Sequence, residues 1–172
     1  MIFLRHPTPD VELGVCYGKL DLDIAESGHE QIVRAHSVTP RVTKILASPA
    51  LRCRKLANTI AERDGLEIVF DERLWEMDMG EWEGKRWTEI DRKVSDPWSK
   101  DPFNLPTPGG ECFKDLQARV LEALQDAHSE TAIICHAGPI RAVQMAWLGM
   151  SFSEAFAKQP AYAEPITLHP PK

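Results

Sequence analysis

Five side chains that could act together on a phosphate group follow short apolar runs of this 172-residue sequence. Arg5 and His6 follow the first run, Arg52 the second, Glu76 the third and His136 the fourth. Two guanidinium groups offer planar forks of donors that match phosphate oxygens. A neutral imidazole can attack phosphorus, a protonated one can stabilise developing charge, and a carboxylic acid can protonate a leaving group. The set suits phosphoryl transfer through a histidine, with cationic side chains in the electrostatic role of a metal ion.

The apolar runs are predicted to be strands of one sheet, with helices between them. We predict strands over residues 2–4, 43–47, 67–70, 131–135 and 166–168. We predict helices over residues 26–38, 50–64, 86–94, 111–128 and 139–148. This alternation implies a mainly parallel sheet covered on both faces, in which ligands bind beyond the carboxyl ends of the strands. Four prolines predict a stretch without regular structure over residues 96–110, a candidate mobile loop.

The composition is that of a globular chain. Apolar residues make up 43% and charged residues 27%, and the length suits one domain over residues 1–172. No apolar run approaches the roughly 20 residues of a membrane span, and the apolar start is too short for a secretion signal. The net charge of −6 disfavours nucleic acid as a partner. We therefore expect a cytoplasmic protein with neither membrane nor nucleic-acid partners.

The cysteines supply an alternative. All four are widely spaced, unlike zinc ligands or a disulfide framework, and they are Cys16, Cys53, Cys112 and Cys135. Cys135 to Arg141 fits C-x5-R, the phosphate loop of cysteine-dependent phosphatases, and it joins a predicted strand to a predicted helix. That mechanism leaves His6 and Glu76 without a role, so we favour Cys135 as a buried thiol.

Six stretches are informative through their order and spacing. They are residues 4–6 (LRH), 24–31 (IAESGHEQ), 48–52 (SPALR), 74–84 (LWEMDMGEWEG), 108–111 (PGGE) and 136–141 (HAGPIR). In these stretches the chain resembles the histidine phosphatase (phosphoglycerate-mutase-like) superfamily, along nearly its whole length. The resemblance implies a three-layer α/β/α sandwich with a mixed, mainly parallel sheet.

The resemblance also implies a role for each matching residue. His6 becomes the nucleophile that forms a phosphohistidine, and Glu76 becomes the proton donor. The phosphate pocket is then made by Arg5, Arg52, His136 and Ala137. The implied enzyme is a metal-independent, histidine acid-type phosphatase that needs no cofactor and acts on a small phosphomonoester. Its oligomeric state is left open, with a dimer among the alternatives.

Residues 14–23 (GVCYGKLDLD) resemble the alpha-ribazole phosphatase branch, which acts in cobalamin synthesis. This branch implies alpha-ribazole 5'-phosphate as the substrate. The alternatives are a broad-specificity metabolite phosphatase, a phosphoglycerate-mutase-like phosphotransferase and an inactive phosphate-binding module. The run Pro7-Thr8-Pro9 departs from the Gly and Glu-Thr common in the family, and Ala137 stands for a frequent Gly.

Several other residues have two readings. Four tryptophans either stack a substrate's base or wall the core, and they are Trp75, Trp82, Trp87 and Trp98. Second-tier candidates for substrate contact are Lys19, Arg54 and Arg141. The other histidines are expected at the surface, and they are His29, His36, His128 and His169.

Overall fold

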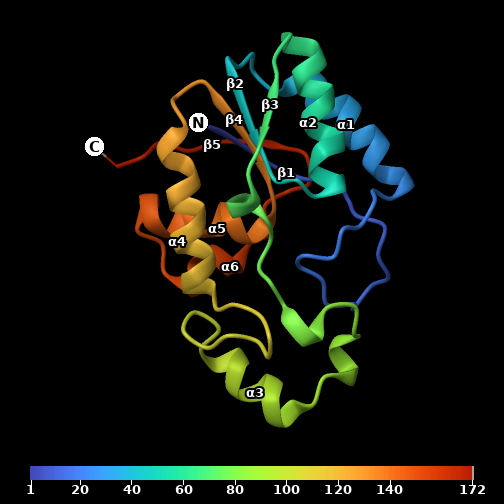
Figure 1. Cartoon of the computed structure of the whole chain (residues 1–172), viewed down its shortest axis with the longest axis vertical. Coiled ribbons are helices and arrows are strands. Elements are labelled where there is room, and N and C mark those ends of the chain that lie inside the picture. Colours follow the sequence, from blue (N-terminus) through green and yellow to red (C-terminus); the bar gives the residue numbers. More distant parts are fainter. Residues whose placement is uncertain (172) are drawn as a thin grey trace.

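The computed structural model describes residues 1–171, which fold around one five-stranded sheet (Figure 1). Lys172, the last residue of the predicted domain 1–172, lies outside the described residues. The strands are β1 (Ile2–Arg5), β2 (Lys44–Ala47), β3 (Ile68–Phe70), β4 (Thr131–Cys135) and β5 (Pro165–Thr167). Their order is β3-β2-β4-β1-β5, and only β5 runs antiparallel. The sheet is therefore mixed and mainly parallel, as predicted.

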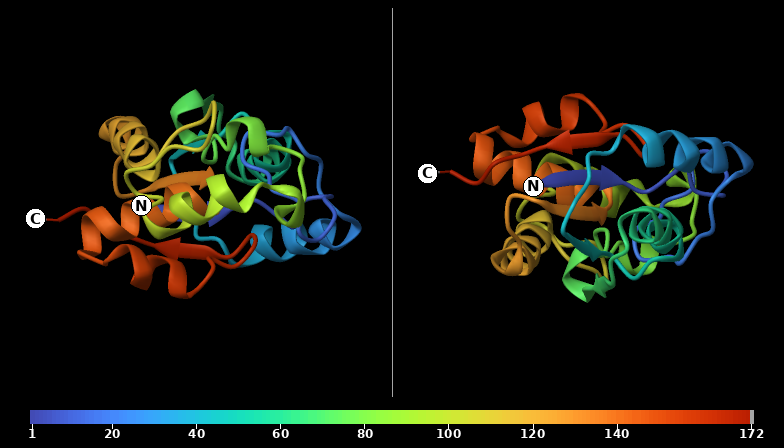
Figure 2. Two further views of the ribbon diagram at one scale, coloured as in Figure 1. Left: turned by 90° about the horizontal axis from the view of Figure 1, so that it is seen from below. Right: turned by 90° about the horizontal axis from the view of Figure 1, so that it is seen from above.

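Helices cover both faces of this sheet, which gives three layers (Figures 1 and 2). The helices are α1 (Glu26–Val38), α2 (Leu51–Asp64), α3 (Arg92–Lys100), α4 (Phe113–Ala123), α5 (Ala137–Leu148) and α6 (Phe152–Ala157). Helices α1 and α2 pack on one face, α4 and α5 on the other, and α6 packs on α5. Among residues 1–171, no helix has the length and hydropathy to cross a membrane.

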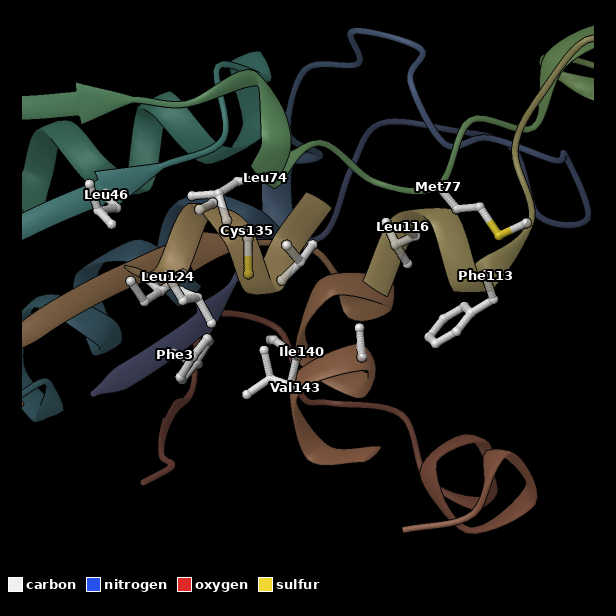
Figure 3. Close-up of a cluster of buried hydrophobic side chains, with 14 of the residues drawn as sticks. Phe3, Leu46, Leu74, Met77, Phe113, Leu116, Leu124, Cys135, Ile140 and Val143 are labelled. Atoms are coloured by element: carbon white, nitrogen blue, oxygen red, sulfur yellow. The ribbon is translucent and has the colours of Figure 1, made fainter. Parts of the chain in front are cut away.

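The central strands explain why two cores form. Every residue of β1 and β4 is buried, as continuous apolar strands of a covered parallel sheet require. Successive side chains point to opposite faces. Phe3 therefore joins the core under α4 and α5 (Figure 3), whereas Leu4 joins the core under α1 and α2.

The segment after β3 corrects two predictions. The helix expected over residues 86–94 is instead a single 3₁₀ turn at Trp87–Glu89, followed by α3. Helix α3 begins after Asp91 because the Asp91 carboxylate accepts a hydrogen bond from the Lys93 N–H. It continues through Pro97, so residues 96–100 of the stretch expected to lack regular structure are helical. A proline removes one donor but does not prevent a short helix whose Trp98 packs on Trp82.

Helix boundaries shift elsewhere for local reasons. The helix expected over residues 111–128 is α4 plus a 3₁₀ turn at Leu124–Asp126. It starts later because the Asp115 carboxylate accepts the Cys112 N–H. Helix α6 was not predicted, although Ser151 and Glu154 form the reciprocal cap that the spacing S-x-x-E favours.

Candidate active site

The pairing of β1 with β4 brings two histidines together. Arg5 lies opposite Cys135, so the next residue on each strand is a histidine. The His6 N–H donates to the Cys135 carbonyl over 2.9 Å, and the rings of His6 and His136 are 5.1 Å apart, centre to centre. On the other side of β4, the Ser48 N–H extends the ladder to the Ile134 carbonyl. The carboxyl ends of three neighbouring strands therefore meet at one point.

His6 is held in the tautomer that a nucleophile needs. Its Nδ1 lies 2.7 Å from the Pro7 carbonyl, which can only accept, so Nδ1 carries the hydrogen and Nε2 keeps its lone pair. The side chain is only 1% exposed. Burial, and then the charge of Arg52, hold the pKa of His6 well below its ordinary value of 6.5. The ring is therefore neutral at pH 7.

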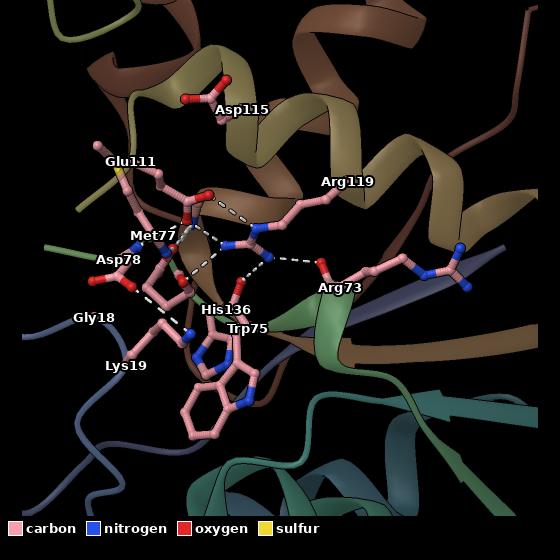
Figure 4. Close-up of polar contacts among 12 residues, drawn as sticks. Gly18, Lys19, Arg73, Trp75, Met77, Asp78, Glu111, Asp115, Arg119 and His136 are labelled. Carbon is pink, nitrogen blue, oxygen red and sulfur yellow. Dashed lines mark hydrogen bonds and ion pairs between the residues drawn. The ribbon is translucent and has the colours of Figure 1, made fainter. Parts of the chain in front are cut away.

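His136 is fixed at both ring nitrogens. Arg52 Nη2 lies 3.2 Å from Nδ1, and Ser48 Oγ lies 2.8 Å from Nε2. Because a guanidinium only donates, Nδ1 accepts and Nε2 carries the hydrogen. Trp75 stacks on the ring with 10° between the planes, and in Figure 4 the two rings lie face to face.

The protonation of His136 differs from the sequence-based expectation. We expected a second, protonated imidazole, but burial and then Arg52 hold the pKa of His136 well below 6.5. The folded protein therefore keeps the ring neutral at pH 7. In this tautomer the neutral ring donates its Nε2–H to Ser48 Oγ.

Arg52 is fully buried and binds the loop before α1. Its Nη1 donates to the Leu20 carbonyl over 2.6 Å and its Nη2 to the Gly18 carbonyl over 2.7 Å. Its Nε has no partner among the described residues. Gly18 is required here, because a Cβ at this position would overlap the Met77 carbonyl. Arg52 thus orients His136 and anchors the 18–20 loop.

Arg5 is buried against the C-terminal part of the chain. Its Nη1 donates to Gln159 Oε1 over 3.1 Å and to the Pro160 carbonyl over 3.0 Å. Its Cζ lies 3.8 Å from the centre of the Tyr162 ring, which is a cation–π contact. Tyr162 also lies against His6, with ring centres 5.7 Å apart. Burial and then neighbouring Tyr162 raise the pKa of Tyr17 to about 12, so its phenol stays neutral.

Glu76 sits at the start of α5. Both of its carboxylate oxygens lie 3.1 Å from the Gly138 N–H, and Oε1 also accepts the Met77 N–H. A negative charge is favoured at this end of a helix. Gly138 has no room for a side chain, because an added Cβ would overlap Glu76 Oε1. Helix α5 and Glu76 therefore fix one another.

A half-buried ion pair holds the segment that carries Glu76 (Figure 4). Arg119 on α4 pairs with Glu111 over 2.6 Å. Its guanidinium also donates to the carbonyls of Arg73, Trp75 and Glu76, over 2.7, 2.8 and 3.0 Å. Glu111 in turn accepts the Asp78 N–H over 2.8 Å. One guanidinium thus fixes the backbone on which Glu76 stands.

A cavity of about 380 Å³ opens beside these groups. Arg5, Glu76 and Ala137 are among its lining residues, whereas His6, Arg52 and His136 are not. The latter three are buried behind the lining, within contact of each other. The structure thus gathers all six predicted site residues at one end of the sheet, with three on the cavity wall.

Of the remaining candidates, Arg141 lines the cavity, whereas the others have structural or surface positions. Cys135 is fully buried in the core, and burial raises the pKa of its thiol well above the ordinary value, which disfavours a thiolate nucleophile. Lys19 pairs with Asp78 and Arg54 with Asp21, each over 3.7 Å. The histidines predicted at the surface, His29, His36, His128 and His169, are exposed.

The tryptophans divide into two groups. Trp82, Trp87 and Trp98 pack together, whereas Trp75 stacks on His136. Trp82 is buried in the core, while Trp87 and Trp98 line the cavity. Trp82 therefore walls the core as one interpretation predicted, whereas stacking of Trp87 or Trp98 on a substrate stays a prediction.

The Thr8 side chain is not part of the cavity lining. The Thr8 hydroxyl accepts a hydrogen bond from Gln31 Nε2, so it is bonded to α1 rather than directed into the cavity.

Three residues at the site had no predicted role: Ser48, Arg119 and Tyr162. Ser48 stood at a predicted strand end, but Arg119 and Tyr162 carry no local signal, because only the fold brings them to the site.

Known proteins of similar sequence include several named as phosphatases. The family model described as the histidine phosphatase superfamily (branch 1) matches residues 1–169. A protein from Hydrogenobacter thermophilus named as a candidate phosphoserine phosphatase is 32% identical over 153 residues, covering 83% of this chain and 75% of the relative. A glucosyl-3-phosphoglycerate phosphatase from Mycolicibacterium vanbaalenii is 27% identical over 168 residues, covering 87% and 74%.

The solved structures include a candidate alpha-ribazole-5'-P phosphatase from Escherichia coli. It superposes with a TM-score of 0.83 at 18% identity, covering 95% of this chain and 86% of that one. This likeness confirms the predicted sandwich fold.

Proposed function

This chain belongs to the histidine phosphatase superfamily, and from that premise we propose that it hydrolyses phosphomonoesters through a phosphohistidine on His6. One observation carries the proposal: a neutral imidazole with a free Nε2 lies among two arginines, a second histidine and a carboxylate. Neutral imidazole is the nucleophilic form, and burial keeps His6 in that form at pH 7.

The first step transfers the phosphoryl group to the protein. His6 Nε2 forms a bond to phosphorus while the bond from phosphorus to the ester oxygen breaks. The leaving oxygen takes a proton from the carboxyl group of Glu76, which lines the cavity. Arg5, Arg52, His136 and the backbone of Ala137 at the start of α5 stabilise the charge on the phosphoryl oxygens.

The second step returns the protein to its starting state. A water molecule attacks phosphorus and gives its proton to the Glu76 carboxylate, while His6 Nε2 leaves with its electron pair. The contacts of Glu76 with Gly138 and Met77 suit the carboxylate that accepts this proton. Inorganic phosphate is then released. No step uses a metal ion, and residues 1–172 act as one domain.

For the natural substrate, we propose alpha-ribazole 5'-phosphate. The segment GVCYGKLDLD at residues 14–23 supports this choice, and its Tyr17 lines the cavity. A phosphate-release panel with alpha-ribazole 5'-phosphate, phosphoserine and phosphoglycerate tests it. Equal rates across the panel would instead favour a broad-specificity phosphatase. Transfer to a second hydroxyl without phosphate release would favour a phosphotransferase.

The class of reaction is tested with p-nitrophenyl phosphate and the variant His6→Ala. We expect turnover to fall by on the order of 10³-fold or more, since the nucleophile is lost. The matched control His29→Ala removes an exposed histidine and should retain full activity. Thiol alkylation and chelator should leave wild-type turnover intact. A His6→Ala variant that keeps most of its turnover would contradict the proposal.

A further inference from the structure

The cavity beside His6 has an aromatic wall that the proposed chemistry does not use. Apart from the residues next to the phosphate site, its lining is mostly apolar. The apolar residues are Met77, Met79, Trp87, Trp98, Pro102, Phe113, Phe152 and Phe156. A volume of about 380 Å³ lies within the range of pockets that bind small molecules.

The aromatic wall and the residues of the phosphate site line one cavity, so the wall would contact the alcohol part of a bound phosphomonoester. Arg5, Glu76, Ala137 and Gly138 line the same cavity, so a phosphoryl group held by them would point its ester oxygen toward the remaining space. Glu76 is the proposed donor to that oxygen. The alcohol part of the substrate must therefore occupy the rest of the cavity, against the rings.

The rings form flat faces with exposed surface. Phe152 and Phe156 stack with centres 4.1 Å apart and 18° between their planes, and Trp87 and Trp98 stack at 24°. Trp87 remains 45% exposed and Phe156 37%. An apolar group in the cavity would cover these two exposed aromatic side chains, which is favourable because apolar surface is removed from water. An aromatic ring would add favourable ring-to-ring packing.

Arg141 adds a buried cation to the same wall. It is only 8% exposed, and its buried Nε has no hydrogen-bond partner among residues 1–171. Its Cζ lies 4.3 Å from the centre of the Phe156 ring. A π-system in the cavity would offer this cation a further favourable face. A carboxylate on the substrate is the competing partner.

We propose that this cavity selects phosphomonoesters whose alcohol carries a planar apolar ring, over those with small polar alcohols such as serine or glycerate. The inference rests on the proposed function, because it assumes that the phosphoryl group sits at His6. It goes beyond that function by assigning specificity to Trp98, Arg141 and Phe156.

The experiment compares wild-type kcat/KM for phenethyl phosphate and ethyl phosphate. Both are primary alkyl esters with similarly poor leaving groups, so the chemical step is matched and only the ring differs. We expect phenethyl phosphate to be preferred roughly tenfold to a hundredfold, the gain from burying one aromatic ring. Cyclohexylethyl phosphate should fall between them, because it is apolar but not planar.

Variants then locate the effect. Phe156→Ala and Trp98→Leu should reduce the preference for phenethyl over ethyl phosphate. The control Phe70→Ala removes an exposed phenylalanine from β3, far from the cavity lining, and should keep the preference. A preference that survives both cavity variants would overturn the assignment.

The outcomes also separate this inference from the proposed function. Equal kcat/KM for phenethyl and ethyl phosphate, or a higher value for phosphoserine, would overturn the inference and leave the phosphatase in place. A higher kcat/KM for phosphoserine would indicate that Arg141 binds the substrate's carboxylate. Failure to release phosphate from p-nitrophenyl phosphate as well would overturn both.

Discussion

The rings of His6 and His136 lie 5.1 Å apart, centre to centre, and both are buried; among residues 1–171, no carboxylate bonds either ring. This closeness follows from the parallel pairing of β1 with β4. The last paired residues are Arg5 and Cys135, and a histidine follows each of them. Burial and the neighbouring guanidinium of Arg52 lower the pKa of both rings. The pair is therefore neutral in the folded protein but titrates normally once the chain unfolds.

Folding stability should fall as the pH falls below about 6.5. The unfolded chain binds a proton at each of these histidines near that pH, whereas the folded chain does not. Each buried ring then reduces the free energy of unfolding by about 1.4 kcal/mol per pH unit. Urea unfolding between pH 7.5 and pH 5 measures this slope. The lowered pKa values of Asp64 and Asp71 change the free energy of unfolding only below about pH 4, outside this window.

A variant isolates the contribution of one ring. His6→Gln should remove about half of the slope, while His29→Gln, at an exposed position, should leave it unchanged. Stability that is flat across this range in the wild type would contradict the buried neutral pair.

Arg52 should be needed for turnover although it is far from the surface. Its guanidinium bonds His136 and two loop carbonyls, and a lysine could not make these contacts together. We expect Arg52→Lys to lower kcat for p-nitrophenyl phosphate by on the order of 10²–10³-fold. The control Arg54→Gln changes an exposed neighbour paired with Asp21 and should cost little. Thermal melting of each variant separates catalysis from folding.

Glu76 should matter in proportion to the difficulty of the leaving group. Glu76→Gln should slow alkyl phosphates by about 10²–10⁴-fold and p-nitrophenyl phosphate far less, since p-nitrophenol needs little protonation. Gly138→Ala should give the same pattern, because the added methyl group displaces the Glu76 carboxylate. The control is Glu81→Gln, an exposed carboxylate nearby. Equal losses on both kinds of ester would point to another acid.

Arg119 should act as a positioning residue for Glu76. It donates to the backbone carbonyls of three residues that end at Glu76 and pairs with Glu111. Arg119→Met should slow alkyl phosphates by up to about 10²-fold, with the leaving-group dependence of Glu76→Gln, because a small misplacement of the acid is costly. Arg119→Lys should restore part of the rate. Arg92→Met, at an exposed arginine of α3, is the control. A uniform loss on all esters would indicate a merely structural role.

The sequence predicted the strands and the convergence of site residues because both depend on local pattern. Buried parallel strands are continuous apolar runs, and the residues that follow them meet at one edge of the sheet. Residues 2–4 and 131–135 therefore led directly to His6 and His136. The order of the six motifs added the fold, which a TM-score of 0.83 to a solved structure supports.

What the sequence did not predict depends on tertiary contacts. Helix α3 passes through Pro97 because Asp91 caps its start and Trp98 packs on Trp82. The neutral state of His136 could not be read either, since it arises from complete burial and from a guanidinium 84 residues away in sequence. A local sequence pattern cannot predict such packing, complete burial or the approach of a distant side chain.

The most direct measurement is the trapping of the phosphorylated protein. Wild-type protein mixed with a radiolabelled phosphomonoester and quenched in alkali should carry label on the peptide that contains His6, and acid should release it. His6→Ala should carry none. Label on the peptide that contains Cys135, or phosphate release by His6→Ala at the wild-type rate, would contradict the account.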